Sequence, residues 1–285
     1  MPKIKIGDAH LFFDIYGSNL KIEQQQCQEK PSLLILHGAH GIVDHSLYVA
    51  FWSQFADIAQ VIFLDQRGCG RSDYRSANEW SLQQWGQDVY DFCDALSIDK
   101  PIVAGVSMGG HVICEYASRY PQHPGGIIFC NTEAKLDVDA IADKYGELGG
   151  AEVAAIYRQN FFSPTAETAR QYKAHCVPLF AKNAYTQEQI NRCVQRPEIL
   201  AHYNQHELQT MNYLDKLATI ACPTLFMVGE KSPGHPPKSA KDAATRIKPE
   251  LVTYHEFNNA GAPVYNDAPD EAYQVVRQFV KELSD

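Results

Sequence analysis

Short runs of consecutive hydrophobic residues alternate along most of the chain with amphipathic segments. Each run is four or five residues long, which is typical of a strand buried on both faces. The runs lie at residues 32–36, 61–64, 101–104 and 126–130. The amphipathic segments lie at residues 47–59, 81–97 and 111–120. Strands that alternate with helices over short connections indicate a mostly parallel sheet with helices on both faces.

The two ends of the chain extend this pattern. Residues 3–6 and 10–16 alternate between hydrophobic and polar positions, which predicts an opening hairpin, and the polar stretch 18–30 is expected to be a surface loop. Towards the other end, a strand, a helix, a strand and a closing helix are predicted at 223–229, 237–247, 251–257 and 269–283. The whole pattern predicts an α/β fold with a mostly parallel sheet of eight strands.

The pattern changes between residues 135 and 215. Runs typical of strands disappear, and helical stretches rich in Tyr, Phe, Gln and Ala take their place, interrupted by Pro164, Pro178 and Pro197. A helical insertion in a parallel sheet is well placed to cover the strands' carboxyl ends, where ligands bind. We therefore expect a core at 1–134, a helical cap at 135–215 and the rest of the core at 216–285. The alternative is a peripheral helical decoration.

Composition and charge narrow the partners of the protein. The 285 residues are 45% hydrophobic and 21% charged, as in a globular protein, and the formal net charge is −9. A general nucleic-acid or anionic-membrane binder needs a basic face, so neither nucleic acid nor a membrane is expected as a partner. Residues 1–8 contain no segment resembling a signal peptide and no later run is long enough to span a membrane, so a cytoplasmic location is expected.

The eight cysteines form no C-x-x-C pair, and several lie in hydrophobic runs. Buried free thiols are the favoured interpretation. No His or Cys pair has the spacing of metal ligands on a recognisable element, so no metal site is predicted.

Residues 105–110 carry the strongest chemical signal. They read Gly-Val-Ser-Met-Gly-Gly and lie between a buried strand and a helix, which is the setting of a nucleophile elbow with Ser107 at the turn. Glycines at 105 and 109 permit a turn too tight for side chains, and the helix that follows directs its N-terminal amides at an anion formed on the substrate. The alternative is an ordinary turn between a strand and a helix.

Two further motifs follow the two preceding strands. His37-Gly38 follows the first, and residues 65–72, reading Asp-Gln-Arg-Gly-Cys-Gly-Arg-Ser, follow the second. With the elbow after the third strand, the chain resembles the α/β-hydrolase superfamily over nearly its whole length, and within it the proline iminopeptidase-like branch with its lactonase and esterase relatives. The resemblance implies that Ser107 is the nucleophile and that the amides of Ala39 and Met108 form the oxyanion hole.

The chain departs from the family at the two other catalytic positions. The family acid follows the strand that ends at Gly229, but Ser232 occupies its place. The family histidine follows the last strand, where Ala262 stands instead. Glu133, which follows the strand at 126–130, is the preferred substitute acid because some members of the superfamily carry the acid there. Glu230 is the next candidate.

No substitute for the histidine is evident from the sequence. His40 and His111 are expected near the site as positioned or structural residues, His255 within a strand, and His235 in a loop without an assigned role. The chain is therefore expected to lack its general base and to be inactive or strongly impaired. Ala262 is then either a deliberate replacement of histidine, which we favour, or a natural loss that leaves a binding protein.

The resulting hypothesis is a serine hydrolase that cleaves an ester, lactone or amide bond of a small, partly apolar substrate. Ser107 and Glu133 are the expected catalytic residues, with the base belonging at position 262, and His40, Tyr157 and Phe161 are the expected substrate contacts. Such a triad needs no metal or organic cofactor.

Three alternatives remain: a catalytically silent ligand-binding protein, a hydrolase-fold enzyme with other chemistry, and an aminopeptidase. The last would need cap carboxylates, for which the candidates are Glu147, Glu152 and Glu188. The oligomeric state does not follow from the sequence.

Overall fold

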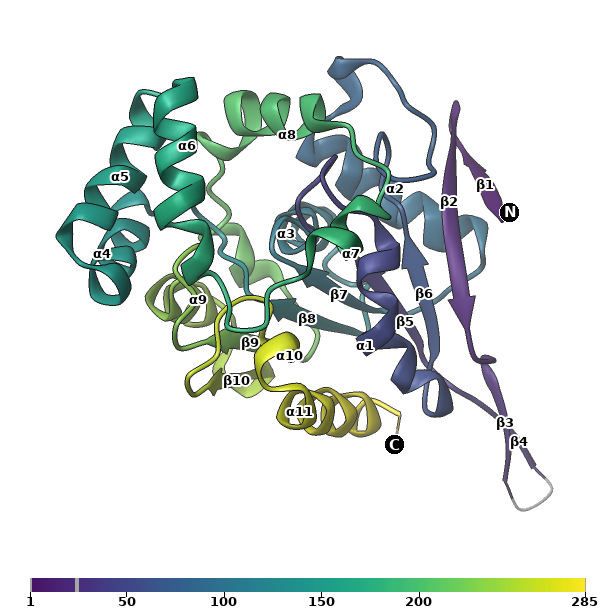
Figure 1. Cartoon of the computed structure of the whole chain (residues 1–285). Coiled ribbons are helices and arrows are strands. Elements are labelled where there is room, and N and C mark those ends of the chain that lie inside the picture. Colours follow the sequence, from purple (N-terminus) through teal and green to yellow (C-terminus); the bar gives the residue numbers. More distant parts are fainter. Residues whose placement is uncertain (1, 24–25, 285) are drawn as a thin grey trace.

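The computed structural model describes residues 2–23 and 26–284. Within those residues, a sheet of eight strands has the order β1-β2-β6-β5-β7-β8-β9-β10 (Figure 1). The first three strands of that order pair antiparallel, and all later neighbours are parallel. The strands are β1 (Lys3–Ile6), β2 (Ala9–Tyr16), β5 (Ser32–Leu36), β6 (Gln60–Leu64), β7 (Ile102–Val106), β8 (Gly126–Cys130), β9 (Thr224–Gly229) and β10 (Val252–Phe257). The predicted mostly parallel eight-stranded sheet is confirmed.

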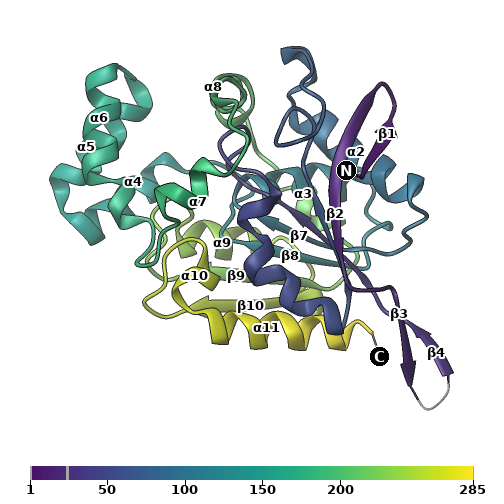
Figure 2. The same cartoon turned by 45° about the vertical axis from the view of Figure 1, so that its right-hand side comes forward.

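Helices cover both faces of this sheet (Figure 2). Because successive side chains on a strand point to opposite faces, Leu34 and Leu36 of β5 join one hydrophobic cluster and Leu33 and Ile35 join the other. The helices of the first face are α2 (Leu82–Ala95), α3 (Met108–Arg119) and α9 (Pro237–Ala244). Those of the second face are α1 (Val49–Trp52) and α11 (Pro269–Glu282). The buried runs of the sequence are therefore strands with a hydrophobic core on each side.

The expectation of a surface loop at residues 18–30 is wrong. β3 (Leu20–Glu23) and β4 (Gln26–Glu29) pair antiparallel as a small hairpin that projects from the body of the molecule (Figure 1). Leu20 and Ile22 of this hairpin are exposed, so the hairpin contributes little to the core. The alternation of Leu20 and Ile22 was the local signal for a strand, and the polar residues around them obscured it.

The segment between β8 and β9 contains helices and no strand in the part of the chain that the structure describes. Its first half has a small hydrophobic core of its own, built around Ile141, Tyr145 and Tyr157. Its second half is attached to the main body, because Ile199 and Tyr203 are buried within the cluster over β5. The α-helices of the segment are α4 (Val138–Gly149), α5 (Ala151–Phe162), α6 (Ala166–His175), α7 (Gln187–Asn191) and α8 (Pro197–Tyr203). The domain boundaries at 134 and 215 stay a prediction.

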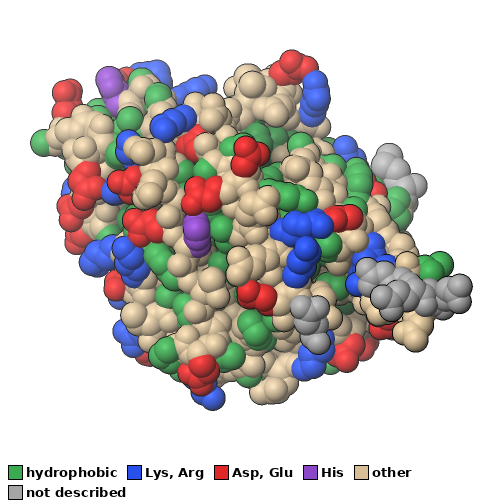
Figure 3. Space-filling view, turned by 90° about the horizontal axis from the view of Figure 1, so that it is seen from below, with side chains coloured by type: hydrophobic (Ala, Val, Ile, Leu, Met, Phe, Trp, Pro, Cys, Tyr) green, Lys and Arg blue, Asp and Glu red, His purple; other side chains and the backbone are tan. Residues whose placement is uncertain are grey.

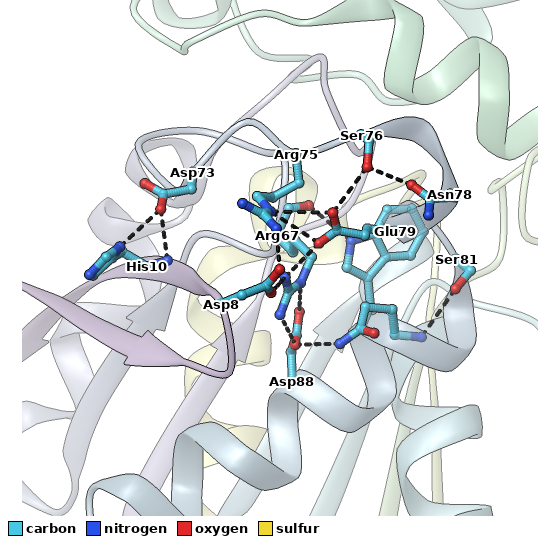
Figure 4. Close-up of polar contacts among 12 residues, drawn as sticks. Asp8, His10, Arg67, Asp73, Arg75, Ser76, Asn78, Glu79, Ser81 and Asp88 are labelled. Atoms are coloured by element: carbon cyan, nitrogen blue, oxygen red, sulfur yellow. Dashed lines mark hydrogen bonds and ion pairs between the residues drawn. The ribbon is translucent and has the colours of Figure 1, made fainter.

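A buried arginine holds the loop that follows β6 (Figure 4). Arg67 donates through Nε and Nη2 to the two oxygens of Asp88, both at 2.8 Å, and through Nη1 to Glu79 at 2.8 Å and Asp8 at 3.3 Å. A bidentate pair of this kind fixes the orientation of both groups. Arg67 of the Asp-Gln-Arg-Gly-Cys-Gly-Arg-Ser motif thus ties α2, the turn after β1 and the motif loop together.

Charged side chains of both signs are spread over the surface. On the face seen from below in Figure 3, acidic and basic side chains are interspersed, with hydrophobic side chains scattered between them. No helix within residues 2–23 and 26–284 is both long and apolar enough to cross a membrane.

Candidate active site

Ser107 stands on a strained turn at the end of β7. Its backbone has φ 52° and ψ −120°, a combination that few residues with side chains adopt. The turn is so tight that a Cβ atom on Gly105 would lie 2.6 Å from the backbone of Gly109. The glycines of the motif are therefore required by close backbone approach, and the local geometry is that of a nucleophile elbow.

A histidine and a carboxylate line up behind this serine. His235 Nε2 lies 3.0 Å from Ser107 Oγ, and His235 Nδ1 is hydrogen-bonded to Glu133 Oε2. The three residues follow β7, β8 and β9, which are neighbours in the sheet, so the carboxyl ends of adjacent parallel strands bring them together. Serine, imidazole and carboxylate in hydrogen-bonded sequence form the geometry of a Ser-His-acid triad.

The expectation that no histidine replaces the missing one beside Ser107 is therefore wrong. Ser107 has an imidazole within hydrogen-bond distance, from His235 in the loop after β9. The family histidine was expected in the loop after β10. That loop makes a backbone contact instead, in which the amide of Ala262 donates to the carbonyl of Phe180 at 2.7 Å. Sequence reasoning missed His235 because it searched the family position. The chain order of serine, acid and histidine was the signal that could have found it.

The two candidate acids have different surroundings. Glu133 is buried beside His235, whereas Glu230 Oε2 accepts a hydrogen bond from the exposed amide of Asn259 at 2.7 Å. Ser232, at the family's acid position, is fully buried, and its hydroxyl has no hydrogen-bond partner among the described residues. Of the two carboxylates considered from the sequence, the structure brings Glu133 to the histidine.

The charge state of Glu133 suits this arrangement. Burial by itself raises the pKa of the carboxyl group, but the facing imidazoles of His235 and His111 outweigh it and hold the pKa well below its ordinary value. An ionised carboxylate only accepts hydrogen bonds, so His235 Nδ1 must carry the proton in their contact. Nε2 of the neutral ring is then an acceptor for the hydroxyl proton of Ser107.

The loop after β5, in which the resemblance places the oxyanion amide of Ala39, lies beside the elbow, since a Cβ atom on Gly38 would lie 3.1 Å from Ser107 Cβ. Ala39 has a positive φ of 41°, and among the hydrogen bonds of the described residues its amide has no acceptor, nor does that of Met108. His37 helps to shape the loop, because its Nε2 accepts from the Gln66 amide at 3.3 Å and its Nδ1 lies 3.0 Å from the Gly38 carbonyl. Burial lowers the pKa of His37, which agrees with a neutral ring held by these two bonds.

The three predicted substrate contacts have different positions. His40 is fully buried, with Nε2 bonded to Gln66 at 2.9 Å and its ring against Trp85, and its role as a substrate contact stays a prediction. Tyr157 is buried in the small hydrophobic core of the helical segment between β8 and β9, and its role as a substrate contact stays a prediction. Phe161 is different, because it lines a cavity of about 330 Å³. The other lining residues of that cavity are Leu136, Val138, Phe162 and Gln209.

A cluster of two carboxylates and a histidine could in principle hold a metal ion. Asp44, His45 and Asp65 are all buried and their potential ligand atoms lie within 4.8 Å of one another. Their atoms already have partners: Asp65 accepts from His45 Nδ1 at 2.8 Å and from the Arg71 amide at 2.8 Å. Asp44 accepts from the Val194 amide at 2.9 Å and from the Ser46 amide at 3.0 Å. These hydrogen bonds account for the cluster, because they connect the loops after β5 and β6 to the helical segment between β8 and β9.

Comparison with known proteins agrees with the fold. The family model described as alpha/beta hydrolase fold matches residues 31–269, so the chain belongs to this family of hydrolases.

Individual relatives have several activities. The chain is 24% identical over 277 residues to 3-oxoadipate enol-lactonase 1 of Acinetobacter baylyi, covering 94% of this chain and 95% of that protein. It is 30% identical over 138 residues to Epoxide hydrolase 1 of Caenorhabditis elegans, which is 46% of this chain and only 32% of that longer protein. The crystal structure of a proline iminopeptidase from Mycobacterium smegmatis superposes with a TM-score of 0.77 at 22% identity, covering 99% and 98% of the two chains. The family is therefore established, and the substrate is not.

Proposed function

We propose that the protein is an active serine hydrolase with Ser107 as nucleophile, His235 as general base and Glu133 as the acid that orients the histidine. The observation that carries this proposal is the hydrogen-bonded sequence from Ser107 Oγ through His235 to Glu133. The hypothesis of a disabled enzyme or a silent binding protein depended on a missing base, and the position of His235 removes that reason.

The mechanism follows from the directions of these hydrogen bonds. Ser107 Oγ attacks the carbonyl carbon of the substrate while its proton passes to His235 Nε2, and the amides of Ala39 and Met108 stabilise the resulting oxyanion. The leaving group takes the proton from His235, and an acyl group remains on Ser107. A water molecule then gives a proton to His235 and attacks the acyl carbon. The bond to Ser107 Oγ breaks as His235 returns that proton to Oγ, which releases the acid and restores the serine. Glu133 keeps the proton of His235 on Nδ1 throughout.

For the substrate, we propose a small, partly apolar ester or lactone. A relative that is an enol-lactonase supports this proposal. The cavity that Phe161 lines has none of Ser107, His235 and Glu133 among its lining residues, so the substrate is not inferred from it. An aminopeptidase would need a free cap carboxylate for the ammonium group. Of the three candidates, Glu147 pairs with Lys144 and Glu188 with Arg192, and all three are on the exposed surface. The lack of an unpaired, buried carboxylate among these three candidates favours the ester or lactone. The relatives include both an enol-lactonase and proline iminopeptidases.

The test combines covalent labelling with turnover. A fluorophosphonate, which reacts with an activated serine, is expected to add once to the protein, and peptide mass spectrometry is expected to place the adduct on Ser107. Ser107→Ala should abolish labelling, and His235→Ala should slow it strongly. Turnover is then measured on activated esters, lactones and a proline anilide. Labelling that is unchanged in Ser107→Ala contradicts the proposal, and preference for the anilide favours the aminopeptidase.

A further inference from the structure

The carboxylate of Glu133 lies between two imidazoles. Its Oε2 is bonded to His235 Nδ1, and its Oε1 lies 3.3 Å from His111 Nε2. The side chain of His111 is 2% exposed and that of Glu133 is 5% exposed, so water does not separate the two groups from each other. The proposed mechanism uses His235 and leaves His111 without a role.

The hydrogen bonds of His111 define which of its nitrogens carries the proton. Nδ1 lies 2.6 Å from the hydroxyl of Tyr203, and Nε2 faces the carboxylate. An ionised carboxylate is only an acceptor, so a neutral His111 suits both neighbours when Nε2 carries the hydrogen and Nδ1 accepts from Tyr203. The Tyr203 hydroxyl is much closer to His111 Nδ1 than to Met211 Sδ, its other contact, at 3.8 Å. In this conformation the Nε2 group has no aligned hydrogen-bond partner among the described residues, and Glu133 Oε1 is the acceptor it faces.

The two residues come from different parts of the fold. His111 is in the first turn of α3, directly after the elbow, while Tyr203 is the last residue of α8 in the cap. The ring of Tyr203 is nearly parallel to that of His111, at 6.1 Å, and to that of His40, at 6.3 Å. The helix itself is attached to the core, because the Arg196 amide donates to the Gly41 carbonyl at 2.5 Å. Tyr203 therefore reaches His111 from an anchored position.

We infer that His111 is a positioning residue that orients Glu133 toward His235, and that Tyr203 of the cap holds His111 in the required tautomer. This inference rests on the proposed function of Ser107, His235 and Glu133. The chain of contacts runs from Ser107 through His235, Glu133 and His111 to Tyr203, so part of the cap belongs to the catalytic apparatus without touching the substrate.

The test separates kcat from KM in three variants. His111→Phe keeps a ring of similar size but removes the N–H that faces Glu133, so kcat is expected to fall about tenfold to a hundredfold, as for other groups that orient a catalytic residue, with KM little changed. His111→Gln, which retains an N–H, is expected to keep more activity than His111→Phe. Tyr203→Phe is expected to lower kcat several-fold and to add nothing in the double variant with His111→Phe.

A matched control is available on the same helix. Tyr213 donates its hydroxyl to Glu115 Oε2 at 2.9 Å, so Tyr213→Phe removes a similar buried hydrogen bond to α3 without touching Glu133. It is expected to leave kcat unchanged. Thermal unfolding of every variant shows whether lost activity reflects lost folded protein. A spectroscopic readout is the downfield proton resonance of His235 Nδ1–H, which His111→Phe should shift and Tyr213→Phe should not.

The outcomes distinguish this inference from the proposed function. Wild-type kcat in folded His111→Phe, or a KM rise with unchanged kcat, overturns the positioning role while the triad stands if Ser107→Ala and His235→Ala are inactive. Equal losses in Tyr203→Phe and Tyr213→Phe also overturn it, because they indicate a general effect on α3. Full activity in Ser107→Ala overturns the proposed function itself, and the positioning role falls with it.

Discussion

The loops after β9 and β10 follow neighbouring parallel strands, yet they make different contacts. The loop after β9 carries His235 to Ser107. The loop after β10 makes structural contacts instead: Ala260 accepts from the Lys231 amide at 2.8 Å, and Ala262 donates to Phe180 in the cap at 2.7 Å. The comparison shows that a histidine in the loop after the adjacent strand reaches Ser107, because the carboxyl ends of parallel strands lie side by side.

The acid follows the same rule. Glu133 lies after β8, the strand next to both β7 and β9, so the acid and the histidine come from consecutive strands beside the nucleophile. The resemblance placed the acid at position 232 and the histidine at position 262, and the small residues Ser232 and Ala262 stand there instead. Relative to the family positions, the carboxylate and the histidine each come from one strand earlier in the chain, while the serine keeps its position after β7.

The largest expected effect separates the two histidine positions. His235→Ala removes the group that takes the proton of Ser107, so kcat should fall by up to about 10⁶-fold. Ala262→His should change kcat by less than about threefold, because His235 is already hydrogen-bonded to the hydroxyl of Ser107 and takes its proton. Both are measured with the best ester found for the wild type. A rise of several powers of ten in Ala262→His would contradict the assignment of His235.

The next effect separates the two carboxylates. Glu133→Gln keeps the shape of the side chain but presents an amide to His235, which permits the wrong tautomer, so kcat should fall by about 10⁴-fold. Glu230→Gln should retain nearly full activity, because its carboxylate bonds the Asn259 amide away from Ser107. The assignment fails if Glu230→Gln is the variant that loses turnover.

A third experiment tests whether the loop after β10 is structural. Asp267 accepts hydrogen bonds from the amides of Gly261 at 2.8 Å, Asn183 at 2.7 Å and Lys182 at 3.1 Å, so it joins that loop to the cap. Asp267→Ala should lower the free energy of unfolding by about 2 kcal/mol, with kcat of the folded protein within about twofold of wild type. Asp270→Ala, on the exposed start of α11, is the control. Denaturant titration measures the difference, and a large kcat loss at full stability would contradict a purely structural loop.

The smallest expected effect is a pH dependence of stability. Because the folded-state pKa of Glu133 lies below its ordinary value of 4.5, the ionised group contributes stability that is present above pH 4.5. That contribution is lost as the pH falls below 4.5 toward the lowered pKa of the folded state. The stability difference between wild type and Glu133→Gln should therefore shrink as the pH is lowered through that range. Unfolding curves at several pH values check this, and a difference that grows on acidification would contradict the direction of the shift.

Much of the fold followed from local pattern. The buried runs at 32–36, 61–64 and 126–130 became strands of the central sheet, because four or five consecutive hydrophobic residues are buried on both faces of a covered parallel strand. The hairpin of β3 and β4 was missed because its strands are not buried. Its exposed strands are mostly polar and have little hydrophobic pattern to detect.

The sequence by itself determined the mostly parallel sheet, the helical segment between β8 and β9, and the elbow at Ser107. These depend on residues close together in the chain, through hydrophobic periodicity and the glycines of one tight turn. Only the tertiary structure decided which histidine faces Ser107, which carboxylate faces that histidine, and that His111 and Tyr203 continue the series. Ser107 and His235 are 128 residues apart, and Glu133 and His235 are 102 apart. Such groups meet because parallel strands end at a common edge, and loop conformation, which has no periodic signal, selects the residue that reaches across it.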